Sequence, residues 1–401
     1  MHNFARMNQR QIFFSHIAQT SPAPPGLEII KAEGIYQYDV SGKKYIDLIA
    51  GFSVANIGHS HPKVVQAIKD QAEKYLHLIV YGEFIESPQT AYAKLLTDHL
   101  PPQLSCVYFT NSGAEATEGA MKLAKRITGR NNIISFNKSY HGSTQGALSI
   151  MGDEYWRQAY RPLLPGIVHA DFGSDKALHY IDDNTACVIM EVVQAESGNN
   201  QTRADWLQAI RKRCTEKNAL LIFDEIQSGF GRTGSLWAFE QFNVVPDVLL
   251  LGKAAGGGMP LGAFISSKQN MDAFTHNPVL GHITTFGGHP VSCAAGKAAF
   301  EILLEDALIN DIRRKENILK ERLQHREIKK LNTCGLWASV HFNSFETCRT
   351  VVHNCIDGGL ITDWLLFAPQ CLRIAPPLSI TAAELHRACD ILLESIDKLS
   401  A

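Results

Sequence analysis

The sequence predicts an α/β fold in which helices surround a mainly parallel sheet. Between residues 105 and 266, short apolar runs alternate with helical patterns, as they do in successive βα units. Runs that are apolar throughout are typical of strands buried on both faces, as in parallel sheets. The expected strands contain residues 106–109, 133–136, 186–190, 219–223 and 248–252.

The two ends of the chain have a different pattern from this middle region. Residues 34–40 and 43–47, separated by a Ser-Gly pair, predict a β-hairpin. After about Pro290, a long helical pattern leads into a smaller α+β segment. Because 401 residues can hold a large core and two domains, we expect a large domain with the sheet and a smaller α+β domain.

Composition and charge exclude several classes of protein. Charged residues make up 19% of the chain and the formal net charge is −2, so neither nucleic acid nor a membrane surface is an expected partner. No stretch approaches the roughly 20 apolar residues of a membrane span, and residues 1–6 lack the apolar core of a secretory signal. The nine scattered cysteines indicate reduced thiols in a cytoplasm. No metal is expected, because His59 and His61 lack further ligands at a suitable spacing and fit a turn.

Asp224 and Lys253 are the most informative residues, and each one ends an apolar run. In an open α/β sheet, both side chains would lie at the carboxyl edge of the strands, where ligands bind. Pyridoxal phosphate chemistry needs such a pair: the lysine amine forms a Schiff base with the aldehyde, and the carboxylate keeps the pyridine nitrogen protonated. The sequence therefore predicts a pyridoxal 5′-phosphate site with Lys253 as covalent anchor and base, and Asp224 as the partner of the ring.

The stretches around this pair resemble a known family. Residues 222–234 contain Phe-Asp-Glu-Ile-Gln-Ser-Gly-Phe-Gly-Arg-Thr-Gly, and residues 252–262 contain Gly-Lys-Ala-Ala-Gly-Gly-Gly-Met-Pro-Leu-Gly. Both closely resemble the class III aminotransferases, the group of the ornithine, acetylornithine and 4-aminobutyrate aminotransferases. The resemblance runs from about Gly34 to Leu378. It implies the fold-type-I architecture of pyridoxal-phosphate-dependent transferases, with a seven-stranded type of sheet in the large domain.

The resemblance also implies a domain partition and an assembly. In the family the two ends of the chain form the small domain together, which gives boundaries at residues 1–50, 51–290 and 291–401. Residues 283–290 resemble the family's threonine motif, whose threonine reaches the phosphate of the neighbouring subunit. This points to Thr285 and to a homodimer with shared active sites; an ordinary loop hydroxyl is the alternative.

A phosphate site is expected where a helix follows the strand at 106–109. Free backbone N–H groups and the positive end of the helix dipole favour an anion there. Gly113 and Ala114 would donate N–H groups and Ser112 its side chain, because Gly113 allows a close approach. The alternative is a capped helix in which Ser112 serves only its own backbone.

The resemblance assigns three further residues to the cofactor. Tyr140 would stack on the pyridine ring, with His141 close by, and Gln227 would hydrogen-bond the phenolic oxygen of the ring. Covering the edge of the core is the alternative role for Tyr140. Asp224 needs a buried setting with the pyridinium as its partner, since an unpaired buried carboxylate would take up a proton.

The substrate side rests on two motifs of the same family. Residues 372–378 match its late arginine motif, which implies that Arg373 grips the α-carboxylate of amino and keto acids. Residues 191–198 resemble the stretch whose later glutamate pairs with that arginine. Glu196 is therefore a candidate switch that masks or releases Arg373, and a surface loop carboxylate is the alternative.

Two departures from the family leave the amino donor open. Ser143 stands where many ornithine and acetylornithine relatives carry an arginine that grips a second carboxylate, and Arg157 or Arg161 is the candidate replacement. Phe52, a candidate substrate-binding residue, lacks the hydroxyl that the ornithine enzyme has there. We therefore expect ping-pong transamination between an ω-amine or amino acid donor and a 2-oxo acid acceptor.

Four alternatives remain open at this point. They are a strictly specific acetylornithine- or 4-aminobutyrate-type aminotransferase, an aminomutase of the glutamate-1-semialdehyde kind, a decarboxylase of the same fold, and a regulatory or structural protein that only binds pyridoxal phosphate. The aminomutases usually lack the Gln-x-Gly-x-Gly-Arg-Thr-Gly run of residues 227–234. A protein that only binds the cofactor has no need of the carboxylate grip of Arg373.

Overall fold

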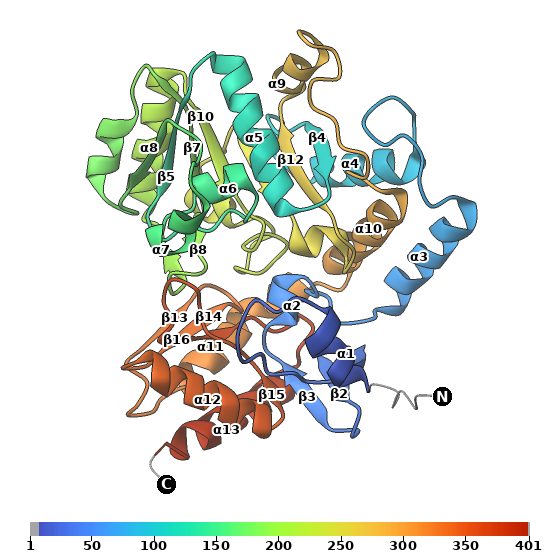
Figure 1. The fold of residues 1–401 in the computed structure, drawn as a ribbon, viewed down its shortest axis with the longest axis vertical. Coiled ribbons are helices and arrows are strands. Elements are labelled where there is room, and N and C mark those ends of the chain that lie inside the picture. The colour runs from blue at the N-terminus through green and yellow to red at the C-terminus, as the bar shows by residue number, and fades with distance from the viewer. Residues whose placement is uncertain (1–7, 400–401) are drawn as a thin grey trace, which may run out of the picture.

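A seven-stranded sheet forms the centre of the larger part of the protein in the computed structural model, which describes residues 8–399 (Figure 1). The strands lie in the order β4-β12-β11-β10-β7-β5-β6. Strand β12 runs antiparallel to β4 and β11, and the other neighbours are parallel, which confirms the mainly parallel seven-stranded sheet. The bounds are β4 (Cys106–Thr110), β5 (Asn132–Phe136), β6 (Ile167–Ala170), β7 (Thr185–Met190), β10 (Leu220–Asp224), β11 (Val248–Leu251) and β12 (Gly262–Ser266).

Helices cover both faces of this sheet. In β10, Leu221 and Phe223 pack against α8 (Ala204–Lys217), while Ile222 belongs to the core under α5 (Gly113–Thr128). Successive side chains of a strand point to opposite faces, so a strand between two helical layers must be apolar at every position. This is why the apolar runs in the sequence predicted the central strands.

Two shorter sheets form the smaller part of the molecule, below the large sheet in Figure 1. One has the order β1-β2-β3-β15 and the other β13-β14-β16. Strand β15 pairs with β3 in parallel, so the two ends of the chain share a sheet, and β2 and β3 form the expected hairpin. The bounds are β1 (Ile29–Glu33), β2 (Tyr36–Asp39), β3 (Lys44–Asp47), β13 (Lys330–Thr333), β14 (Ala338–His341), β15 (Leu360–Ile361) and β16 (Cys371–Ile374).

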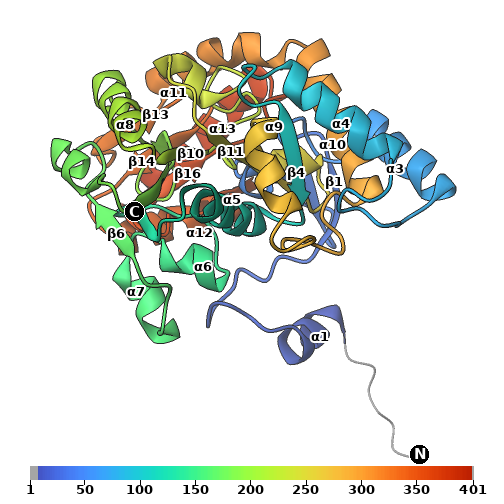
Figure 2. The same cartoon turned by 90° about the horizontal axis from the view of Figure 1, so that it is seen from above.

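The remaining helices surround these sheets. Helices α11 (Ile312–Arg322), α12 (Phe345–Asp357) and α13 (Ala382–Asp397) lie in the smaller part, and α3 (Pro62–Lys74), α4 (Ser87–Asp98) and α10 (Pro290–Glu305) pack together beside the large sheet (Figure 1). Helix α1 (Gln9–His16) stands apart from the rest of the chain in Figure 2 and buries none of its residues. The short elements are α2 (Ala50–Ser53), α6 (Gln145–Ser149), α7 (Glu154–Arg157), α9 (Lys268–Met271), β8 (Val193–Gln194) and β9 (Asn200–Gln201).

The sequence analysis also led to expectations about domain boundaries, cysteines, membrane spans and metal sites. The partition at residues 50 and 290 stays a prediction, although α10 packs with α3 and α4 rather than with the last three helices. All nine cysteines are free. Within residues 8–399, no helix is long and apolar enough to cross a membrane, and no three metal-binding side chains gather. The segment 1–6 lies outside the described residues.

Candidate active site

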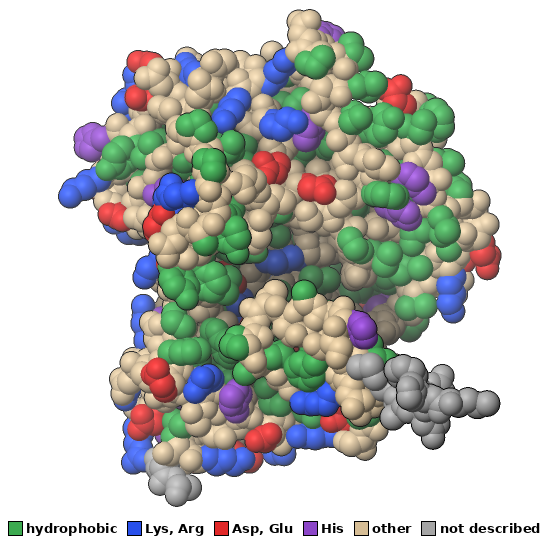
Figure 3. Space-filling model, viewed as in Figure 1, with side chains coloured by type: hydrophobic (Ala, Val, Ile, Leu, Met, Phe, Trp, Pro, Cys, Tyr) green, Lys and Arg blue, Asp and Glu red, His purple; other side chains and the backbone are tan. Residues whose placement is uncertain are grey.

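A cavity of about 220 Å³ lies at the carboxyl ends of the parallel strands. Strands β10 and β11 are parallel neighbours, so Asp224 at the end of β10 and Lys253 just after β11 reach the same edge of the sheet. Figure 3 shows that the molecule is hollowed between its upper and lower parts. The lining consists of Gly113, Ala114, Tyr140, His141, Gly142, Ser143, Glu191, Val193, Ala195, Glu196, Asp224, Ile226, Gln227, Ser228 and Lys253.

Lys253 presents its amine to this cavity. Its backbone is left-handed, with φ of 46°, directly after Gly252. The Lys253 Nζ donates a hydrogen bond of 2.9 Å to Oε1 of Gln227. Burial lowers the pKa of the Lys253 amine, while the charges of Glu196 and Asp224 act in the opposite direction. A lowered pKa increases the share of neutral amine, which is the nucleophilic form.

Asp224 is held by two hydrogen bonds. Its Oδ2 lies 2.7 Å from Nδ1 of His141, and its Oδ1 accepts a 3.0 Å bond from the N–H of Ile226. Burial of His141 acts against its charged form, yet the hydrogen bond and charge of Asp224 outweigh it and raise the pKa of His141. The Nε2 atom of His141 is buried without a hydrogen-bond partner. Each oxygen of Asp224 keeps a lone pair with which to accept a proton donor in the cavity.

Glu191, directly after β7, is a cavity residue that the sequence analysis did not assign. Its two oxygens accept hydrogen bonds from the N–H groups of Tyr140 (3.1 Å) and Ala195 (3.0 Å). Burial, joined by the charge of Asp224 and opposed by that of His141, raises the pKa of Glu191 to about 7. The signal that could have found it is the one that found Asp224, a carboxylate at the end of a fully buried strand.

The start of α5 forms one wall of the cavity. Ser112 caps this helix, and its Oγ accepts a 3.2 Å bond from the N–H of Glu115, as in the capping alternative. The N–H groups of Gly113 and Ala114, at the first two positions of the helix, have no helical carbonyl to bond to. A Cβ on Gly113 would lie 2.7 Å from Cδ1 of Ile226, so only glycine fits this wall without displacing its neighbour.

Tyr140 and Ser143 also line the cavity, and the Tyr140 hydroxyl lies 3.2 Å from Oγ of Ser143. The expected replacement cation is not beside them. Arg157 and Arg161 both form ion pairs with Glu154, and neither lines the cavity in the described part of the chain. Both guanidinium groups instead bind the nearby carboxylate of Glu154 on α7.

Arg373, on β16 in the smaller part, does not line the described cavity but binds Glu196, which does. It forms a bidentate ion pair with Glu196, with N–O distances of 2.9 and 3.0 Å, and its Nε donates a 2.8 Å bond to Asp363. Burial acts against ionisation of Glu196, but the charge of Arg373 outweighs it and lowers the pKa of Glu196. Burial raises the pKa of Asp363, against the opposing charge of Arg373. The structure thus brings the predicted Glu196–Arg373 pair together and adds Asp363, which no sequence pattern marked.

Phe52 covers the guanidinium of Arg373, whose Cζ lies 5.1 Å from the centroid of the ring. The short helix α2, which carries Phe52, has positive φ angles at all four of its residues, 50–53. Asp47 supports this strained segment, because its Oδ1 accepts the N–H groups of Ile49 and Ala50 and its Oδ2 pairs with His59. This contact explains His59 without a metal.

Thr285 lies outside this cavity. It is exposed, whereas its neighbour Thr284 accepts a 3.0 Å hydrogen bond from Asn111. The loop of Thr285 contacts the segment after α3, where the rings of His77 and Phe286 are 4.8 Å apart. Exposed apolar side chains gather on these two segments: Leu76, Leu78, Ile79, Phe84, Ile85, Val279, Leu280, Ile283 and Phe286.

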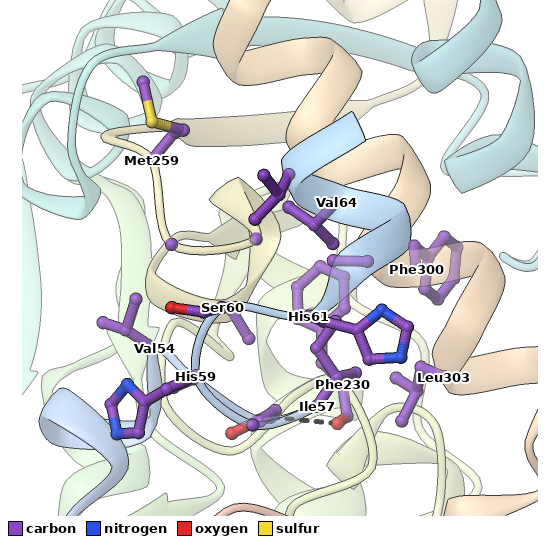
Figure 4. Close-up of a pocket in the computed structure, with 18 of the residues that line it drawn as sticks. Val54, Ile57, His59, Ser60, His61, Val64, Phe230, Met259, Phe300 and Leu303 are labelled. Carbon is purple, nitrogen blue, oxygen red and sulfur yellow. Dashed lines mark hydrogen bonds between the residues drawn. The ribbon is translucent and has the colours of Figure 1, made fainter. Parts of the chain in front are cut away.

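A second cavity, of about 240 Å³, lies behind the loop that follows Lys253 (Figure 4). Figure 4 shows Val64, Phe230, Phe300 and Leu303 around it, with His61 beside them. Its described lining contains no lysine, arginine or carboxylate and shares no residue with the first cavity. The lysine and the aspartate that the sequence singles out, Lys253 and Asp224, therefore line the first cavity and not the second.

The sequence has clear relatives. The family model described as aminotransferase class-III matches residues 17–396. An acetylornithine aminotransferase from Methanopyrus kandleri is 37% identical over 400 residues, covering 98% of this chain and 100% of that protein. An acetylornithine aminotransferase from Aquifex aeolicus is 36% identical and covers 92% and 96%, and ornithine aminotransferase 2 from Staphylococcus aureus is 36% identical and covers 95% and 96%.

Solved structures share the fold. The ornithine aminotransferase from Toxoplasma gondii, with partial occupancy of PLP at its active site, matches with a TM-score of 0.89 and 29% identity, covering 97% of this chain and 93% of that one. An (S)-enantioselective ω-transaminase from Thermomicrobium roseum matches with a TM-score of 0.87 and 26% identity, covering 97% of each chain. These likenesses confirm the fold-type-I architecture.

Proposed function

Because this chain belongs to the class III aminotransferases, we propose that it transfers an amino group from an ω-amine or amino acid to a 2-oxo acid, with pyridoxal 5′-phosphate bound between Lys253 and Asp224. The observation that carries the proposal is that a lysine amine with a lowered pKa and a histidine-supported aspartate face one cavity. Of the other residues expected to contact this cofactor, Gly113, Ala114, Tyr140, His141 and Gln227 line the same cavity.

The residues of the cavity fit this cofactor. Three buried polar atoms there have no hydrogen-bond partner: Nε2 of His141, Nε2 of Gln227 and Oγ of Ser228. Buried polar groups are rarely left unbonded, so these atoms indicate a polar occupant. Gly113 and Ala114 would hold a phosphate at the start of α5, with Ser112 as a contributor, and Tyr140 would cover the ring. When bound, pyridoxal phosphate supplies an aldehyde for covalent attachment and an electron sink for the substrate Cα carbon.

The residues around this cofactor have separate tasks. Lys253 would anchor it covalently and then move a proton at the Cα carbon of the substrate. Asp224 would accept a hydrogen bond from the protonated pyridine nitrogen, and His141 keeps the carboxylate oriented. Gln227, which already accepts a hydrogen bond from Lys253, would bond the phenolic oxygen of the ring.

Arg373, Glu196 and Phe52 would select the substrate. A guanidinium binds a carboxylate through two parallel hydrogen bonds, and Glu196 now occupies that place. With Glu196 on Arg373 the site suits a donor without a carboxylate there, and with Glu196 displaced it suits a 2-oxo acid. Phe52 shields this ion pair from water on one side.

The amino donor is proposed to have a neutral or cationic tail. Ser143 offers no charge for a second carboxylate, and Arg157 and Arg161 are engaged with Glu154. The wall of Tyr140 continues into an apolar cluster of Leu148, Met151, Phe367 and Leu366. A strictly acetylornithine-specific enzyme is the second candidate, which the names of the relatives favour.

A homodimer with shared sites and a cytoplasmic location complete the proposal. The apolar segments around residues 76–85 and 279–286 favour burial against a second copy, because an exposed apolar patch of this kind marks an interface. Thr285 lies within this surface, which suits a role at the partner's phosphate. The nine free cysteines favour a reducing compartment.

Separate half-reactions test this function. The yellow holoenzyme is mixed with one donor, such as 1-phenylethylamine, putrescine, acetylornithine or glutamate, and loss of its visible absorption is followed. After removal of the donor, a 2-oxo acid is added and the new amino acid is measured. We expect one amino group per site to pass from donor to acceptor, with neutral and cationic amines reacting at least as well as glutamate.

The alternatives give different results in this experiment. If acetylornithine or glutamate alone reacts, the strictly specific enzyme replaces the broader one. An aminomutase would isomerise a single substrate without passing an amino group to the added 2-oxo acid, and a decarboxylase would release carbon dioxide. A protein that only binds the cofactor would give no transfer, and the proposal would then be wrong.

A further inference from the structure

Three polar residues form a row across the small sheet β13-β14-β16. Asn332 lies opposite Ser339, and Ser339 lies opposite Arg373. Directly opposed residues on neighbouring strands place their side chains on the same face. All three side chains contact one turn of the larger part, residues 195–199, which joins β8 to β9.

The row holds this turn at two points. Arg373 binds the side chain of Glu196, while Asn332 Nδ2 and Ser339 Oγ donate hydrogen bonds of 2.6 and 2.8 Å to the carbonyl oxygen of Gly198. Gly198 has φ of 106°, and a Cβ there would lie only 3.0 Å from Cε1 of His341. The turn therefore rests directly on β14, and both lone pairs of the Gly198 carbonyl are used.

We propose that Asn332 and Ser339 act as a carbonyl clamp on Gly198 and thereby set how strongly Glu196 competes with a substrate carboxylate for Arg373. The inference rests on the proposed function, in which Arg373 binds the carboxylate of a 2-oxo acid. When that carboxylate displaces the Glu196 side chain, the carbonyl clamp keeps the backbone of the turn in place. Glu196 then stays beside Arg373 at a high effective concentration and closes the site again when the acid leaves.

Other bonds also hold this turn and limit the expected effect, among them the bond from the N–H of Ala195 to Glu191. The backbone carbonyl of Glu196 accepts a 3.0 Å bond from the N–H of Phe367, and its Oε2 accepts a 2.9 Å bond from the N–H of Leu366. These bonds remain when the carbonyl clamp is removed. The loss should therefore weaken closure over Arg373 without abolishing it. Asn332 and Ser339 are positioning residues, because they contact neither the cavity nor the substrate.

Equilibrium binding of 3-phenylpropionate to the holoenzyme tests the carbonyl clamp. This monocarboxylate has no amino or keto group, so calorimetry measures its competition with Glu196 without turnover. Asn332→Ala and Ser339→Ala should each tighten its binding by roughly threefold, and the double variant by about tenfold, because a turn that is held less firmly presents Glu196 to Arg373 at a lower effective concentration. The half-reaction with 1-phenylethylamine should slow in the same variants, since Arg373 is then less well masked. General structural damage would weaken both.

Two further variants calibrate the measurement. Glu196→Gln removes the ion pair and sets the upper limit of the gain in binding. Gln201→Ala is the matched control, because it also removes a hydrogen bond from this hairpin to β13, to the carbonyl of Thr333, but leaves Gly198 held. Its binding should stay within about twofold of the wild type.

The outcomes distinguish a failure of the carbonyl clamp from a failure of the proposed carboxylate site at Arg373. Folded clamp variants whose binding of 3-phenylpropionate is unchanged or weaker overturn the carbonyl clamp, and the single variant Asn332→Ala, at a half-buried position, decides the matter if the double variant does not fold. If even Glu196→Gln does not bind the acid, the carboxylate site at Arg373 is wrong, and the carbonyl clamp falls with it.

Discussion

Asp224 and Glu191 follow neighbouring strands of one sheet, yet the chain surrounds their carboxylates differently. Asp224 pairs with Nδ1 of His141 and accepts the N–H of Ile226. Glu191 accepts only backbone N–H groups in a fully buried place, and its pKa is raised to about 7. Two carboxylates at one sheet edge therefore have different partners, and the one assigned to the pyridine nitrogen is the one that pairs with a histidine.

Asp224→Asn should bind the cofactor but transfer amino groups very slowly. Without the carboxylate, nothing holds the proton on the pyridine nitrogen, so charge that develops at the substrate Cα carbon is poorly stabilised. We expect kcat to fall by at least about 100-fold while cofactor stays bound, as measured by steady-state assay and absorbance. A rate within about threefold of the wild type would show that Asp224 does not hold the ring nitrogen.

Glu191 should make stability depend on pH near neutrality. Its folded pKa, about 7, lies above the ordinary value of 4.5, so folding takes up a proton between these values. The stability contribution of Glu191 is then fully present below about pH 4.5 and is lost as the pH rises through about 7. The Tm of Glu191→Gln should therefore gain on that of the wild type, by on the order of a few °C, between pH 5 and 8. Parallel Tm curves over this range would contradict the raised pKa.

At the scale of elements, the sequence predicted those whose surroundings impose a simple pattern. The apolar runs of β7, β10 and β11 follow from burial on both faces, and α5 ends at Gly129, whose φ of 68° suits glycine. The sequence did not predict strands β6 and β12. Histidine interrupts the first, and glycine and serine bound the second. Their pairing depends on tertiary contacts that have no period in the sequence.

In the candidate site, too, the sequence predicted some residues and missed others. Strand ends and family motifs predicted the residues around Lys253 and Asp224, and the structure gathers most of them in one cavity. Asp363 and Asp47 were not predicted, because each acts through a residue outside its own segment, Arg373 and His59 respectively. Such partners are set by packing between elements, which a single sequence does not display.

The first turn of α5 gives a prediction at this scale. Gly113→Ala should push Ile226 into the cavity, since the new Cβ would lie 2.7 Å from its Cδ1. The dissociation constant for pyridoxal phosphate should rise at least about tenfold, with little change in the Tm of the cofactor-free protein. Ser112→Ala is the comparison: it removes the cap and should lower that Tm, because an N-cap contributes about 1 kcal/mol. Unchanged affinity in Gly113→Ala would exclude this wall as the phosphate site.

At the scale of the whole molecule, one buried arginine joins the two parts that complete the site. Arg232 donates hydrogen bonds to the carbonyls of Leu336 and Pro376 in the smaller part and to Oδ1 of Asn56. Leu336 precedes β14 and Pro376 follows β16, the strands that carry Ser339 and Arg373. Arg232 thus ties β14 and β16 to the chain just beyond Asp224.

Hybrid dimers test whether two copies share their sites. Inactive Lys253→Ala subunits are mixed with weakened Thr285→Ala subunits under conditions that exchange subunits. If Thr285 completes the partner's phosphate site, each hybrid has one site with neither lesion and should have about half of the wild-type activity, so an equimolar mixture, in which about half of the dimers are hybrids, should recover about a quarter. Hybrids that form without any gain in activity would rule out the shared site.

The central claim is that Lys253 holds the cofactor in this cavity, and borohydride trapping tests it most directly. The holoenzyme is reduced, digested and mapped by mass spectrometry, with Lys253→Ala treated in the same way. The account predicts a pyridoxyl group on Lys253 alone, and no label and essentially no turnover in the variant, because no second lysine lines the described cavity. A label on any other lysine, or a Lys253→Ala enzyme that still transfers amino groups, would contradict the account.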